Sequence, residues 1–118
     1  MYSAQVLDHF QNPRNAGDVA QPDASAQIEN PACGDVLRLS VKVVDGRISE
    51  IGFLAKGCVP SMACASLLTQ LVKGRSLADA RKLRREELVA AAGSLPDESV
   101  HASHLAMDAL GAVLKKLS

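Results

Sequence analysis

The chain has 118 residues, so we expect one domain spanning residues 1–118, large enough to bury an apolar core without disulfides. Its 13 basic and 13 acidic side chains cancel, which argues against nucleic acid or an anionic membrane as the main partner. No apolar run reaches the length of a membrane span, and the chain does not begin with the pattern of a signal peptide. The three cysteines are an odd number, so they cannot all pair in disulfides within the chain. We therefore expect a cytoplasmic protein with free thiols.

The first predicted element is a short helix. Ser3 is a suitable N-cap, and Asn12-Pro13 would end the helix. Its apolar spacing predicts one packed face made of Val6, Leu7 and Phe10. Residues 12–24 follow as a polar loop with proline and glycine.

A β-hairpin is predicted next. Residues 36–44 alternate, with Leu37, Leu39, Val41 and Val43 on one face and Arg38, Ser40 and Lys42 on the other. Asp45-Gly46 is a strong two-residue turn signal, and residues 47–55 form the returning strand. Residues 25–29 are predicted as a third, outer strand.

Helices dominate the second half. One begins near Pro60 and ends before Gly74, and Ser76 to Asp79 resembles a capping box that opens another. Residues 85–92 and 99–117 complete the set. Strands followed by helices predict an α+β fold, an antiparallel three-stranded sheet with helices packed on one face.

Two cysteines lie in glycine-containing loops. Cys33 precedes the first long strand and Cys58 follows the second, so the hairpin brings both loops to the same end of the sheet. With the carboxylate of Asp35 and a histidine from the last helix, the set supplies two sulfurs, one oxygen and one nitrogen. The alternative is that both cysteines are buried structural residues. Their loop positions and glycine neighbours favour a site.

The remaining cysteine and the histidine pair carry weaker signals. Cys64 lies among small apolar residues about one turn into its helix, which favours core packing close to the Cys58 loop. His101 and His104 are three residues apart on the last helix, a spacing that could bind zinc but is common. His101 lies in the first turn and is better placed to reach a loop-borne site, whereas His104 is expected to be a surface residue.

Several motifs resemble those of the IscU/NifU-type iron–sulfur cluster scaffold proteins, at near-constant spacing over essentially the whole chain. The N-terminal part of the match comprises Tyr2-Ser3, Val6, His9-Phe10, Asn12-Pro13-Arg14-Asn15 and Gly17. The middle part comprises Pro31-Ala32-Cys33-Gly34-Asp35, Lys56-Gly57-Cys58 and Leu71-Val72-Lys73-Gly74-Arg75-Ser76-Leu77. The last part comprises Leu95-Pro96, His101 and Leu105-Ala106-Met107-Asp108-Ala109-Leu110. The resemblance implies the α+β fold of that family and cluster assembly on Cys33, Asp35, Cys58 and His101, with sulfur from a cysteine desulfurase.

The chain departs from the family in its ligand set. The family has a third cysteine directly after the histidine, which also accepts transferred sulfur, and this chain has Ala102 there. Alanine can neither hold a persulfide nor bind iron, so Cys33, Cys58 or Cys64 would have to substitute. The chain therefore resembles an IscU-type scaffold that lacks the third ligand cysteine. The longer insertion of the zinc-bearing SufU branch is absent.

A second departure concerns a partner. The family recruits an Hsp70-type chaperone through the sequence Leu-Pro-Pro-Val-Lys, and this chain reads Leu95-Pro96-Asp97-Glu98-Ser99. Two acidic residues reverse the local charge, which argues against that chaperone as a partner.

The sequence is compatible with three functions. The first is a non-enzymatic scaffold that binds iron and sulfide, or a nascent 2Fe–2S cluster, and passes it to recipient apo-proteins; mixed Cys/His ligation of such clusters has precedent. The second is a zinc-bearing sulfur acceptor that works with the desulfurase, since the same four side chains make an ordinary zinc set. The third is a relative that docks a partner without building clusters.

Overall fold

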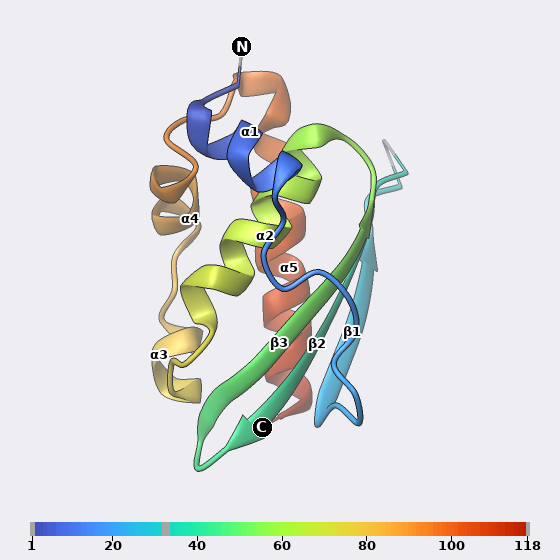
Figure 1. The fold of residues 1–118 in the computed structure, drawn as a ribbon, viewed down its shortest axis with the longest axis vertical. Coiled ribbons are helices and arrows are strands. Elements are labelled where there is room, and N and C mark those ends of the chain that lie inside the picture. Colours follow the sequence, from blue (N-terminus) through green and yellow to red (C-terminus); the bar gives the residue numbers. More distant parts are fainter. Residues whose placement is uncertain (1, 32–33, 118) are drawn as a thin grey trace.

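The computed structural model describes residues 2–31 and 34–117. A single antiparallel sheet, in the order β1-β2-β3, forms one layer, and the helices cover one of its faces (Figure 1). The strands are β1 (Ala24–Glu29), β2 (Val36–Val44) and β3 (Arg47–Lys56). The helices are α1 (Ala4–Gln11), α2 (Val59–Val72), α3 (Leu77–Arg81), α4 (Arg85–Ala91), the 3-10 turn η1 (Asp97–Ser99) and α5 (Val100–Lys116). The predicted α+β fold is confirmed.

Local sequence signals explain where these elements begin and end. Asp45 and Gly46 both have positive φ, 54° and 75°, which is what a tight two-residue hairpin turn requires. The hydroxyl of Ser3 accepts from the Val6 amide, and that of Ser76 accepts from the Asp79 amide, so both predicted caps are present. No helix in the described residues is long and apolar enough to cross a membrane.

The core lies between the sheet and the helices α2 and α5. Leu37, Leu39 and Val41 of β2 are buried there as predicted, while Val43 is only partly buried. The register shifts between Lys42 and Val43, so the regular alternation ends at that point.

The opposite face of the sheet is not simply polar. Ser40, predicted on the solvent side, is fully buried, and its hydroxyl accepts a hydrogen bond of 2.9 Å from the Val19 amide. The loop before β1 crosses the sheet here, with the Gly17 amide bonded to the Phe53 carbonyl. A Cβ on Gly52 would lie 2.1 Å from the Gly17 carbonyl oxygen, so glycine is required for this crossing.

The buried face of helix α1 differs from the predicted one. Val6 is buried as expected, but Leu7 and Phe10 are 41% and 38% exposed. His9 takes the buried position instead, with its Nδ1 2.7 Å from the Ser66 hydroxyl of α2. The same hydroxyl accepts from the Arg14 amide at 2.8 Å, so its own hydrogen is available to His9. One buried histidine therefore links α1, α2 and the following loop.

This arrangement predicts a pH-dependent stability. Burial, together with the nearby charge of Arg14, lowers the pKa of His9 below its ordinary 6.5. The unfolded chain therefore binds a proton that the folded protein excludes, and the free energy of unfolding should decrease as the pH falls below 6.5. Urea unfolding at about pH 7.5 and about pH 5.5 measures this. His9→Gln should reduce the difference and the exposed-site control His104→Gln should not; an unchanged difference in His9→Gln would exclude His9 as its source.

Candidate metal centre

Three side chains meet at one end of the sheet. Asp35 directly precedes β2, Cys58 follows β3 as the N-cap of α2, and His101 lies in the first turn of α5. Pairing of Val36 with Lys56 places the start of β2 beside the end of β3. The prediction that the hairpin brings the two loops together is thus confirmed for Asp35 and Cys58. Cys33 lies outside the described residues, so its place in the site stays a prediction.

The three ligand atoms lie close together. The Cys58 Sγ is 3.2 Å from Asp35 Oδ2 and 3.7 Å from His101 Nε2, and the Nε2–Oδ2 distance is 3.6 Å. A tetrahedral ion with bonds of about 2.0–2.3 Å keeps its donors about 3.3–3.8 Å apart. Within the described residues, these three are the group whose ligand atoms all lie within 4.8 Å of one another. The observed spacing is therefore close to one face of a tetrahedral site.

Hydrogen bonding sets which nitrogen of His101 is available. Its Nδ1 is 3.0 Å from the Glu98 carbonyl oxygen, which can only accept, so Nδ1 carries the hydrogen. In a neutral imidazole, Nε2 then presents a lone pair toward Asp35 and Cys58. Once the Cys58 thiol has lost its proton, three electron-pair donors face one another, and this arrangement favours a shared cation between them.

The Asp35 carboxylate is buried and held from two sides. Ser61 donates a hydrogen bond of 2.5 Å to Oδ2 and lies 3.2 Å from the Cys58 sulfur. On the other side, a Cβ on Gly57 would lie 2.3 Å from Oδ1, so the carboxylate occupies space that only glycine leaves. Ser61 was not among the residues predicted to lie at the site. Its position three residues after Cys58, on the same face of the helix start, is the signal that could have found it.

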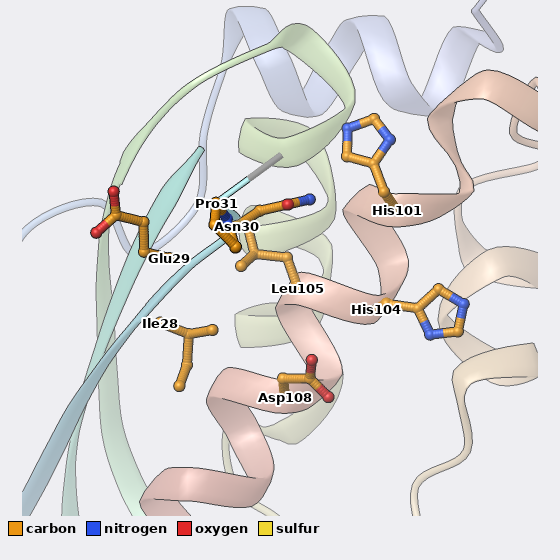
Figure 2. Close-up of a pocket in the computed structure, with 8 residues that line it drawn as sticks. All are labelled: Ile28, Glu29, Asn30, Pro31, His101, His104, Leu105 and Asp108. Atoms are coloured by element: carbon orange, nitrogen blue, oxygen red, sulfur yellow. The ribbon is translucent and has the colours of Figure 1, made fainter. Parts of the chain in front are cut away.

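His104 does not join the three ligand atoms. It is exposed and, with His101, stands at the rim of a groove of about 280 Å³ beside the end of β1 (Figure 2). Glu29, Asn30 and Asp108 also line this groove. The expectation that His101 rather than His104 reaches the site agrees with this arrangement.

Cys64 packs in the core, as its neighbours predicted. The side chain is fully buried, and burial, with a smaller effect from the nearby Cys58 charge, raises the pKa of its thiol to about 12. A thiol that resists ionisation to this extent is a poor metal ligand at neutral pH.

Cys64→Ser should therefore reduce stability more than metal binding. A hydroxyl in this apolar position lacks a partner, which we expect to cost about 1–3 kcal/mol in the free energy of unfolding. Urea unfolding and a Co²⁺ titration of the same sample measure both effects. Loss of metal binding at unchanged stability would show instead that Cys64 is a ligand.

Fold and site together define a small α+β protein with a candidate metal centre built by two loops and a helix start. The family model described as "NifU-like N terminal domain" matches residues 1–118. This chain belongs to that family.

Curated relatives and a solved structure agree with this assignment. The chain is 43% identical to the iron–sulfur cluster assembly scaffold protein IscU 1 of Archaeoglobus fulgidus, over 93% of this chain and 72% of the relative. It is 40% identical to the IscU scaffold protein of Escherichia coli K12, over 96% and 91% of the two chains. The crystal structure of the N-terminal part of a NifU-like protein from Brucella abortus superposes with a TM-score of 0.79 at 20% identity, covering 98% and 92%. This last likeness supports the fold.

Proposed function

We propose that this chain is a non-enzymatic scaffold on which an iron–sulfur cluster is assembled before it is passed on. The observation that carries the proposal is the convergence of Cys58 Sγ, Asp35 Oδ2 and His101 Nε2 within 4.8 Å. Relatives with about 40% identity over nearly the whole chain bear the name of such scaffolds.

The proposed ligands of this cargo are Cys33, Asp35, Cys58 and His101. The thiolates suit iron–sulfur centres, and the carboxylate and imidazole complete the set. Cys58 is exposed enough to react, being only partly buried, and its side chain makes no cap hydrogen bond to its own helix. Its sulfur instead contacts Asp35, Ser61 and His101, so it already faces the proposed site. We further propose that residues 1–118 fold as one cytoplasmic domain.

The partners follow from the chemistry. Sulfur has to reach a thiolate of this chain as a protein-bound persulfide, which is what a cysteine desulfurase carries, and a reductant has to supply the two electrons that turn each persulfide sulfur into sulfide. The finished cluster then has to leave for recipient apo-proteins. With Ala102 beside His101, sulfur would be received on Cys33 or Cys58. Asp97 and Glu98 are both exposed in η1 and make this surface acidic. The family motif that binds an Hsp70-type chaperone carries a lysine in this stretch, so we propose that such a chaperone is not a partner.

The same spacing would also suit a single zinc ion, so the competing function is a zinc-bearing sulfur acceptor. Anaerobic reconstitution with Fe²⁺ and sulfide, followed by visible absorption and metal analysis, separates the two. We expect charge-transfer absorption with iron and sulfide in equal amounts on the chain. Bound zinc that iron and sulfide do not replace would contradict the scaffold function and favour the acceptor.

A further inference from the structure

One buried hydroxyl contacts two of the three ligand side chains. Ser61 lies in the first turn of α2 and is 3% exposed. Its Oγ is 2.5 Å from Asp35 Oδ2 and 3.2 Å from Cys58 Sγ. Within the described residues, both hydrogen-bond contacts of this hydroxyl lead into the candidate centre, so the hydroxyl is placed to act on it.

The direction of the hydrogen bonds follows from the donors present. A carboxylate accepts only, so the Ser61 hydrogen points to Asp35 Oδ2. The Cys58 thiol then has three acceptors within reach, which are that oxygen, the Ser61 oxygen and His101 Nε2. A carboxylate oxygen has two acceptor directions. Ser61 occupies one direction on Oδ2, and Cys58 and His101 lie 3.2 Å and 3.6 Å from the same oxygen.

We propose that Ser61 is a positioning residue for metal binding. Its hydroxyl holds the Asp35 carboxylate in the orientation in which Oδ2 faces the space between Cys58 and His101. The backbone of Gly57, packed against Oδ1, closes the opposite side, so the carboxylate has little freedom to rotate. A metal would lie on the side of Oδ2 that faces Cys58 and His101, while the Ser61 bond remains. The inference rests on the proposed ligand set and deepens it.

A titration with Co²⁺ alone tests this role. Cobalt bound to a thiolate gives a charge-transfer band, and its d–d bands report ligand geometry. Losing the hydrogen bond to a ligating carboxylate typically costs 10–100-fold in metal affinity, and we expect Ser61→Ala to lose about that much and to shift the d–d bands. Ser61→Thr, which keeps the hydroxyl, should bind within a few-fold of the unmodified protein, and the similarly shaped Ser61→Val should not.

Ser66→Ala is the matched control. Ser66 is a buried serine on the same helix whose hydroxyl bonds His9 and the Arg14 amide, away from the candidate centre. It should lower stability and leave Co²⁺ affinity unchanged. Equal affinity and equal spectra in Ser61→Ala and the unmodified protein would overturn the proposal, as would an equal loss in Ser66→Ala. Tight Co²⁺ binding that depends on Ser61, in a chain that assembles no cluster, would support this inference and contradict the proposed function.

Discussion

Replacing Cys58 with serine is expected to remove metal binding while leaving the fold intact. Even the loss of a hydrogen bond to a metal ligand costs about 10–100-fold in metal affinity. Loss of the ligand thiolate itself should therefore cost more than about 100-fold for Co²⁺ or Zn²⁺. Stability should hold, because Cys58 is the N-cap of α2 and serine is a preferred N-cap residue. Metal titration and thermal unfolding of one preparation measure both quantities.

Cys64→Ser provides the comparison for that variant, since Cys64 is a buried thiol on the same helix. The two substitutions should have opposite profiles. Cys58→Ser should lose metal and keep stability, and Cys64→Ser should keep metal and lose stability. Metal affinity within a few-fold of the unmodified protein in Cys58→Ser would place the ligand sulfur elsewhere.

Introducing a thiol next to His101, at Ala102, is expected to give the largest gain of function. Ala102 is 1% exposed at the start of α5, and Ala102→Cys adds a soft donor beside a proposed ligand. We expect several-fold more cluster per chain in desulfurase-dependent assembly and slower loss of cluster to a chelator, because iron–sulfur centres favour thiolates. Visible absorption over time follows both.

Ala106→Cys is the control for this change. Ala106 is also 1% exposed and lies one turn further along α5, away from the helix start. The Ala106→Cys variant should fold with the extra sulfur atom and assemble no more cluster per chain than the unmodified protein. If Ala102→Cys assembled no more cluster than the unmodified chain and released it no more slowly, Ala102 would not limit assembly, and the zinc or docking functions would be favoured.

The hairpin was predictable because its determinants are local. Asp45-Gly46 specifies the turn between β2 and β3. Because the turn pairs these two strands, Asp35 before β2 and Cys58 after β3 lie at the same end of the sheet. The position of His101 near Asp35 and Cys58 was expected from the family resemblance and from its place in the first turn of the last helix, and its role as a ligand stays a prediction.

What escaped prediction depends on contacts between distant residues. His9 is buried because Ser66, 57 residues away, offers its hydroxyl, and helical periodicity favoured the apolar Phe10 instead. Ser40 is buried because the loop around Gly17 crosses Gly52 on the outer face of the sheet. Polarity patterns cannot reveal a hydroxyl whose partner is a backbone amide elsewhere in the chain.

Cluster transfer tests the central claim most directly. The chain would be supplied anaerobically with Fe²⁺, cysteine, a cysteine desulfurase and a thiol reductant that converts persulfide sulfur to sulfide. An apo-ferredoxin would then be added while visible circular dichroism is recorded. We expect a cluster signal on this chain, dependent on Cys58, that is replaced by the signal of the holo-ferredoxin. Desulfurase turnover with no cluster signal on the chain, and no faster formation of holo-ferredoxin than without the chain, would contradict the account.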